Sequence, residues 1–548
     1  MRSLLLLVGL LQVEPRDRCV LLSAEVRKSP PQIELHWVAD PRAQNYSVSR
    51  KTPSETEWTE LAPSVKGDET SFADPSARVG IVYEYKVFKL GQLKDDRTYQ
   101  GVGHVMAGIE VPLRDRRGKV ILIVDAAHAG PLAEPLERLR RDLVGDGWEV
   151  VRRDVEPKAT PPEVKARIEE LYRADRDGVK ALFLFGHVAV PYSGDFNPDG
   201  HGDHKGAWPA DAYYGDLDGE WSDDQVDDAK ASRAENRNVR GDGKFDPSRI
   251  PSPVALEVGR VDLSQMPAFG KTEAELLRRY LDKDHDFRHR RVEAERRGLI
   301  CDKFGDFRGE AFVSSGWRNF APLVGDDKVT AADWFKTLGA GSYLVAQGSG
   351  AGGYQSCAGV GATRDFAATP TKAVFTLLFG SYFGDWDTRD NLLRAPLAAE
   401  SHGLVAVWAG RPHWHLHPMA LGETIGYCAR LTQNNRGLYQ PTGSFAGGVH
   451  VALMGDPTLR LHPVAPPSAL QRGAGKLTWS ASVDAGATYH VYHAADEKGP
   501  FTRLTDSPIQ ETAFAAKEQA GVYMVRAIKL ETGPSGSYVN ASQGIFAP

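Results

Sequence analysis

The sequence predicts a multidomain protein in which a central α/β unit with a doubly wound parallel sheet is flanked by two all-β sandwiches. Three observations lead to this fold class. The chain has 548 residues, which is too long for a single hydrophobic core. Its middle alternates apolar strands with amphipathic helices, whereas its ends carry short strands separated by turn residues. The two ends also resemble each other, so we expect related units at residues 20–109 and 464–548.

The composition is that of an ordinary globular protein. The chain carries 66 Lys and Arg against 72 Asp and Glu, a net charge of −6, which argues against nucleic acid as the main partner. No apolar run is long enough to span a membrane. The cysteines number 4, too few for a disulfide scaffold, and the sequence does not pair them.

The chain begins with a short apolar segment. One positive charge precedes a leucine-rich run within residues 1–12, the pattern of a signal peptide. We therefore expect a signal peptide over residues 1–19 and a secreted, periplasmic or cell-surface protein. No small-residue cleavage site precedes Glu14, so a first β-strand or a mis-assigned start is the alternative.

The two ends of the chain carry the pattern of short, half-buried strands. Strand-like runs with period-two alternation occur at Ile33–Trp37 and 80–90 near the start, and at 476–479 and 521–530 near the end. A tryptophan early and tyrosines late in seven short strands predict a β-sandwich. Both units resemble fibronectin type III domains, which usually act as spacers or adhesive surfaces.

The central unit, residues 110–463, changes to alternating strands and helices. Apolar runs such as Val120–Asp125 and 181–185 are joined by helical segments, which favours a parallel sheet buried on both faces. A second set of strands follows from residue 254 to 408. This number of strands is large for a single sheet, so we expect two packed subdomains.

Several motifs in this unit occur in the order found in one enzyme family. They are the acidic loop at 211–219, the strand end at 258–261, the strand at 403–410 and the closing strand at 454–459. The segment from 110 to 462 resembles the gingipain-type cysteine peptidases, relatives of clostripain and the caspases. The resemblance implies a catalytic His and Cys at two strand ends. Here Gln347 and Ser381 stand in those positions.

This substitution leaves the chemistry open. A thiolate and an imidazole titrate near neutral pH, whereas an amide accepts no proton and a hydroxyl needs an adjacent base. Two rescues are conceivable from the residues. Cys357 follows the Gln347 loop and offers a thiol, although a buried inert thiol is the commoner outcome. Alternatively, Ser381 is activated by His413, His415 or His417.

The segment 411–417 and the loop after Ser381 are expected to line the same pocket. The expected lining residues are Asp385, Trp386, Arg411, His413, Trp414, His415 and His417. The aromatic rings among them suit a flat peptide or sugar. The alternate histidines share one face if the segment is extended, which would also suit a transition metal.

An insertion at residues 191–253 is rich in Asp, Asn and Gly. Oxygen ligands at alternate positions with sharp turns are typical of Ca²⁺ loops, and gingipain-like domains bind calcium. The expected ligands are Asp211, Asp216, Asp218, Asn238, Asp242 and Asp246. Solvated turns are the alternative, and His201, Asp203 and His204 could instead hold a transition metal.

The leading hypothesis is a pseudoenzyme outside the cytoplasm that binds or assembles with a protein, peptide or glycan through its cleft. One rival is an active hydrolase with altered catalytic residues. Another is a calcium-stiffened adhesion or spacer protein. The sequence leaves open whether catalysis survives, and it identifies neither the ligand nor the oligomeric state.

Overall fold

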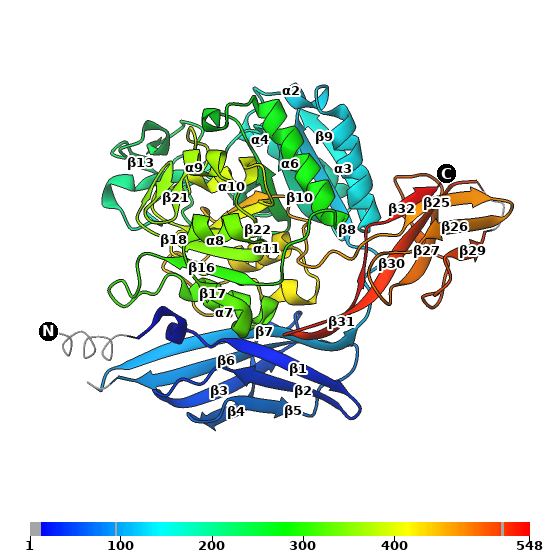
Figure 1. Cartoon of the computed structure of the whole chain (residues 1–548). Helices are drawn as coiled ribbons and strands as arrows, with labels where there is room; N and C mark the ends of the chain where they lie inside the picture. The colour runs from blue at the N-terminus through cyan, green and yellow to red at the C-terminus, as the bar shows by residue number, and fades with distance from the viewer. Residues whose placement is uncertain (1–12, 94–95, 517–519, 548) are drawn as a thin grey trace.

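The computed structural model describes residues 13–93, 96–516 and 520–547, and shows a mixed α/β chain with several sheets (Figure 1). Most of the expected signal peptide, residues 1–12, lies outside the described residues. Within residues 13–19, Pro15–Arg18 forms the 3-10 helix η1, and Cys19 packs into the central core. No described helix combines the length and the apolar character needed to cross a membrane.

The N-terminal unit is built from seven strands around one core. Strands β1 (Leu22–Lys28), β2 (Pro31–Trp37) and β5 (Ser71–Asp74) form one antiparallel sheet. Facing it are β3 (Ala43–Lys51), β4 (Thr59–Lys66), β6 (Val82–Gln92) and β7 (Thr98–Val111). Alternate residues point inward, so Ile33, Leu35 and Trp37 of β2 all enter the shared core. The fibronectin type III assignment of this unit stays a prediction.

The C-terminal unit has a similar arrangement and is joined to the first by backbone pairing. Its small sheet consists of β25 (Ser468–Gly473), β26 (Lys476–Ser480) and β29 (Ala513–Ala515). Its larger set consists of β27 (Thr488–Ala494), β28 (Thr502–Arg503), β30 (Val522–Gly533), β31 (Gly536–Ala541) and β32 (Ile545–Ala547). Strand β31 pairs in parallel with β7, so one nine-stranded sheet runs through both terminal units.

The central unit holds a ten-stranded sheet. Its spatial order is β17-β16-β18-β22-β23-β24-β15-β10-β8-β9. The strands are β8 (Gly118–Asp125), β9 (Trp148–Val155), β10 (Val179–Phe185), β15 (Glu257–Val261), β16 (Gly298–Asp302), β17 (Val329–Ala331), β18 (Tyr343–Ser349), β22 (Ala373–Phe379), β23 (Val405–Trp408) and β24 (Ala452–Gly455). The two strand sets expected as separate subdomains thus share one sheet, because β24 pairs with both β23 and β15.

Both faces of this sheet are buried, as the continuous apolar strands predict. In β8, Val120, Leu122 and Val124 enter one core, whereas Ile121 and Ile123 enter another on the opposite face. The α-helices are α2 (Ala126–Ala129), α3 (Ala133–Gly145), α4 (Pro161–Ala174), α5 (Ala212–Gly215), α6 (Glu273–Arg288), α7 (Ser314–Val324), α8 (Trp334–Ala340), α9 (Thr363–Ala368), α10 (Ala395–Ala398) and α11 (Ile425–Asn434).

The insertion and the loops contribute small elements. Short strands are β11 (Tyr192–Phe196), β12 (Gly206–Pro209), β13 (Asp227–Asp228), β14 (Asn238–Val239), β19 (Gly352–Gly353), β20 (Ser356–Cys357) and β21 (Gly361–Ala362). The 3-10 helices after η1 are η2 (Gly202–His204), η3 (Ala234–Asn236), η4 (Pro267–Phe269), η5 (Asp326–Lys328), η6 (Leu392–Arg394) and η7 (His417–Leu421).

A buried carboxylate ties the N-terminal unit to the central one. Glu84 of β6 accepts hydrogen bonds from Lys51 (2.7 Å), His417 (2.9 Å) and the Tyr439 hydroxyl (2.8 Å). Burial alone raises the pKa of Glu84, but the bonds from His417 and Lys51 outweigh it and hold the pKa below its ordinary value. Lys51 is itself buried, with 2% of its surface exposed, so Glu84 is its counter-charge.

We expect Glu84→Gln to destabilise the protein by about 3–5 kcal/mol, because a buried ammonium group loses its charged partner. Urea unfolding followed by tryptophan fluorescence measures the change. The matched control is Glu25→Gln on the exposed face of β1, for which we expect less than about 0.5 kcal/mol. Equal effects of the two substitutions would contradict the role of Glu84.

Candidate functional site

The candidate site lies where two neighbouring parallel strands end. Strands β18 and β22 pair through Ser349 and Phe379, and both continue into glycine-rich loops. The loops touch so closely that a Cβ atom at Gly352 would lie 2.4 Å from the backbone nitrogen of Ser381. Tyr382 has a φ of 68°, a left-handed conformation that is uncommon for a bulky residue and is concentrated at functional loops.

A histidine from the insertion reaches the serine at this strand end. The Nε2 atom of His201 lies 2.7 Å from the Oγ atom of Ser381, which is hydrogen-bond distance. His201 is exposed, and its ring stacks on Tyr382 with centroids 5.4 Å apart. With the ring proton on Nδ1, Nε2 is an acceptor for the serine hydroxyl. This is the arrangement of a nucleophile and its base.

A second histidine of the same loop fixes the position of the first. His204 is fully buried; its Nδ1 atom lies 2.7 Å from Asp199 and its Nε2 atom 2.5 Å from Asp385. Asp199 also accepts the backbone N–H groups of His201 (3.1 Å) and Tyr382 (3.3 Å). The carboxylate of Asp199 therefore holds the backbone beside both members of the Ser381–His201 pair.

The charge of His204 follows from these contacts. Burial by itself lowers the pKa of an imidazole, but the hydrogen bonds to Asp199 and Asp385 outweigh it and raise the pKa of His204 to about 9. At neutral pH the ring is a cation that donates from both nitrogens. Asp385 also accepts from Arg233 (2.8 Å) and Asn236 (2.8 Å), which anchors the rest of the insertion to the same loop.

Gln347 lies in the interior of the fold. It sits within β18 with none of its surface exposed. Its Nε2 atom donates to the carbonyl of Phe312 (3.2 Å) and to Ser349 (3.3 Å). In the described part of the chain it makes no hydrogen bond to Ser381. The catalytic position implied by the family resemblance is therefore occupied by a packing residue.

Cys357 does not offer an active thiol. Only 1% of its surface is exposed, and its Sγ atom faces the carbonyl of Phe379 at 3.8 Å. Burial raises the pKa of Cys357 to about 12, so its thiolate fraction at neutral pH is negligible. The thiol rescue has no support from the geometry.

The structure also differs from the expected pocket lining. Asp385, Trp386 and Trp414 lie at 0–1% exposure beneath the loops, because their side chains fill the core and the ion network. His413, His415 and His417 are buried as well. Their ring nitrogens lie nearest to Arg411, Asn435 and Glu84 respectively, and none reaches Ser381. The imidazole beside Ser381 is therefore that of His201, not one from this segment.

Arg411 is the member of this set that reaches the surface near the pair. It forms an ion pair with Glu310. Its guanidinium also lies beside Gly200, immediately before His201, where an added Cβ atom would meet Nη2 at 3.0 Å. A cation thus borders the histidine loop.

The expected calcium ligands are distributed over several turns. Asp211 pairs with Arg260, and Asp218 with Arg176. Asp216 and Asp242 accept backbone N–H groups of their own turns, and Asp246 accepts those of residues 224–226. Asn238 donates to the carbonyls of Gly194 and Phe245. Calcium binding by the insertion stays a prediction.

Within the described ranges, one group of three side chains converges as metal ligands do: Asp142, His285 and His289. His201, Asp203 and His204 do not form such a group. Asp142 lies between the two rings, 2.7 Å from Nδ1 of His285 and 2.8 Å from Nε2 of His289.

Comparisons with known proteins give a limited result. No protein-family model matches the chain, and no curated protein matches it. Among solved structures, the Arg-specific cysteine proteinase gingipain R is similar over 79% of this chain and 99% of its own, with 12% identity and a TM-score of 0.48. An Fn3-like protein from Clostridium thermocellum is similar over 15% of this chain and 83% of its own, with 26% identity and a TM-score of 0.12. Pectate lyase PelI from Erwinia chrysanthemi is similar over 20% of this chain and 33% of its own, with 16% identity and a TM-score of 0.13.

The raised pKa of His204 predicts a loss of stability in mild alkali. The extra stability is complete below the ordinary imidazole pKa near 6.5 and disappears as the pH rises through about 9. A shift of this size corresponds to about 3 kcal/mol. Urea unfolding at pH 6.5 to 10 should show this loss in the wild type but not in His204→Gln. His36→Gln in the N-terminal unit is the control and should keep the wild-type pH profile; a His204→Gln profile equal to the wild type would contradict the assignment.

The burial of the cysteines predicts that their thiols do not react in the native protein. Cys19, Cys301, Cys357 and Cys428 are all free and buried, and burial raises the pKa of each thiol. Ellman's reagent should therefore detect less than one thiol in the native protein and 4 after denaturation in guanidinium. Rapid labelling of Cys357 in the native protein would contradict this prediction and would support Cys357 as the nucleophile.

Proposed function

We propose that the chain is a hydrolase of the acyl-transfer type, with Ser381 as the nucleophile and His201 as the general base. The observation that carries this proposal is the 2.7 Å separation between His201 Nε2 and Ser381 Oγ, at an accessible strand end. The hypothesis of an active hydrolase with altered catalytic residues required an imidazole beside Ser381. The proposal takes the histidine from the insertion.

The chemistry needs no group beyond this pair and a water molecule. Nε2 takes the hydroxyl proton as Oγ forms a bond to the substrate carbonyl carbon, which gives a tetrahedral intermediate. The resulting imidazolium returns that proton to the leaving amine or alcohol, the carbon–leaving-group bond breaks, and an acyl-serine remains. Water, activated by the same ring, then hydrolyses the ester and restores Ser381.

The surrounding groups suit such a reaction. The backbone amides of Ser381 and of the glycine-rich loop around Gly352 are the nearest candidates to stabilise the oxyanion. Tyr354 and Tyr382, with ring centroids 5.1 Å apart, offer half-exposed aromatic surface to a substrate. The substrate class is an ester or amide, in keeping with the peptidase resemblance, and the proposed location is outside the cytoplasm.

One observation favours a second function, ligand binding without turnover. The Nδ1 atom of His201 has no acceptor in the part of the chain that the structure describes, so no carboxylate fixes the tautomer of the ring, which is held by stacking on Tyr382. Removal of the orienting carboxylate of a serine triad lowers kcat by about 10⁴. A pseudoenzyme that recognises its ligand at the same cleft would have this geometry.

Labelling with a fluorophosphonate probe separates the two functions. We expect the purified wild type to be labelled covalently, Ser381→Ala to lose all labelling, and His201→Gln to react at least about 100-fold more slowly because it lacks the base. Hydrolysis of a panel of p-nitrophenyl esters should fall in parallel.

The control is Cys357→Ser, which keeps the loop but removes the thiol and should label at the wild-type rate. Asp203→Asn tests a neighbouring exposed charge and should also be neutral. Absence of probe labelling in a folded wild type would refute catalysis and leave the binding function.

A further inference from the structure

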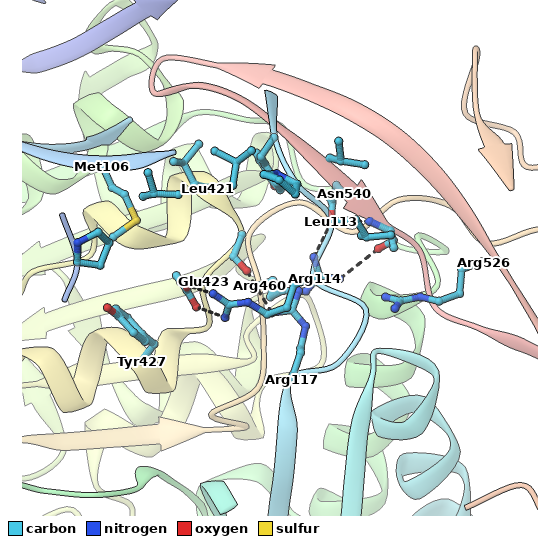
Figure 2. Close-up of a pocket in the computed structure, with 18 residues that line it drawn as sticks. Met106, Leu113, Arg114, Arg117, Leu421, Glu423, Tyr427, Arg460, Arg526 and Asn540 are labelled. Carbon is cyan, nitrogen blue, oxygen red and sulfur yellow. Dashed lines mark hydrogen bonds and ion pairs between the residues drawn. The ribbon is translucent and has the colours of Figure 1, made fainter. Parts of the chain in front are cut away.

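A cavity outside the candidate site lies at the junction of the three units. It has a volume of about 230 Å³ and is lined by residues that follow β7, by the segment 421–427 and by β31 (Figure 2). None of its lining residues belongs to the Ser381–His201 site. Its volume is below that of typical drug-sized pockets, so it suits a small ligand.

Four arginines converge at one end of this cavity. They are Arg114, Arg117, Arg460 and Arg526. Two carboxylates face them: Glu423, which pairs with Arg114 at 2.7 Å, and Asp146, which lies behind the wall. Arg460 binds Asp146 at 2.6 Å, whereas Arg117 and Arg526 remain 3.7 and 3.6 Å from it.

The site therefore holds an excess of positive charge. Four guanidinium groups share two carboxylates, which leaves a net charge of two positive units at this end of the cavity. Arg288 also approaches Asp146, but it has its own carboxylates in Asp284 and Asp456. Burial and the repulsion from Arg460 lower the pKa of Arg117 to about 9. A guanidinium does not normally deprotonate in a protein, so an anion is the natural partner for the excess charge.

Unpaired hydrogen-bond donors in the same cavity also indicate an anionic ligand. Within the described residues, Nε of Arg117, Nη1 of Arg526 and the hydroxyl of Tyr538 are buried and have no hydrogen-bond partner. All three residues line this one cavity, and Arg526 and Tyr538 have 1% and 6% of their surface exposed. Buried polar groups are almost always paired, so three unpaired donors beside an excess of charge indicate an oxyanion that accepts from them.

The opposite end of the cavity has a different character. Val82, Met106, Val111 and Leu421 line it with apolar side chains. Figure 2 shows Met106 and Leu421 grouped apart from the arginines. A ligand that fills both ends has an anionic head and a short apolar group.

We propose that this cavity binds a small organic oxyanion of the phosphate monoester class, with its dianionic head on Arg117, Arg460 and Arg526 and its apolar group against Met106. The bound molecule would contact the N-terminal, central and C-terminal units together, and would link their relative positions to the presence of the ligand.

Calorimetric titration at constant ionic strength tests the proposal with phenyl phosphate, inorganic phosphate and benzoate. We expect phenyl phosphate to bind one site per chain, and to bind at least 10-fold more tightly than either other probe. Binding of inorganic phosphate with equal affinity would overturn the assignment of the apolar end. The absence of binding by all three probes would overturn the site.

Variants separate this site from non-specific charge. Arg117→Met should abolish phenyl phosphate binding while it raises the melting temperature of the free protein, because an uncompensated buried charge is removed. Tyr538→Phe keeps the packing and should weaken binding several-fold. The control Arg152→Met removes a half-buried arginine of β9 that pairs with Asp154, outside the cavity lining, and should bind as the wild type does. Wild-type affinity in Arg117→Met would refute the proposal, and fluorophosphonate labelling of Ser381 should be unchanged in every variant.

Discussion

The geometry of the candidate site depends on one buried cation. His204 lies between Asp199 and Asp385, and these two carboxylates belong to the two loops that carry His201 and Ser381. A charge taken out of water is tolerated only with full compensation, so neither loop can move away without exposing an unpaired ion in the interior. Because Asp199 also accepts the backbone N–H groups of His201 and Tyr382, the same carboxylate holds the backbone on both sides of the Ser381–His201 contact. His201 is exposed and Ser381 half-buried, so their relative position depends on the ion network beneath them.

Buried charge also governs the contacts between the units. Glu84 connects β6 with His417 and Tyr439 of the central unit, and Asp146 connects α3 of that unit with Arg460 and, at longer range, with Arg526 of β30. Apolar contacts tolerate small shifts, whereas an ion pair with hydrogen bonds has one good geometry. The parallel pairing of β31 with β7 adds a backbone constraint to these contacts. At the arginine cavity the compensation is incomplete, which distinguishes it from Glu84, whose carboxylate accepts from Lys51, His417 and Tyr439.

Sequence periodicity predicted the elements better than it predicted their partners. The strand at Val120–Asp125 is present as β8, and its two-sided burial follows from its continuous apolar character. The shared nine-stranded sheet was not predicted, because β7 and β31 lie at opposite ends of the chain and nothing local encodes their pairing. The contact between His201 and Ser381 was not predicted for a similar reason. It lies 180 residues from Ser381, in a polar insertion where a histidine is ordinary, and the only local signal was its place beside His204 and Asp203.

The position of His201 bears on how Gln347 and Ser381 are interpreted. The two positions that the sequence resemblance indicates, Gln347 and Ser381, carry an amide and an alcohol, and neither accepts a proton. Gln347 is fully buried within β18, where its side-chain amide donates to the carbonyl of Phe312 and does not face Ser381. The acceptor comes instead from the insertion, where a 3-10 turn follows it and Asp199 fixes its backbone. A hydroxyl needs such a base more than a thiol does, because its own ionised fraction is negligible. Ser381 and His201 therefore form one unit with the charged network beneath them, which holds Oγ and Nε2 2.7 Å apart.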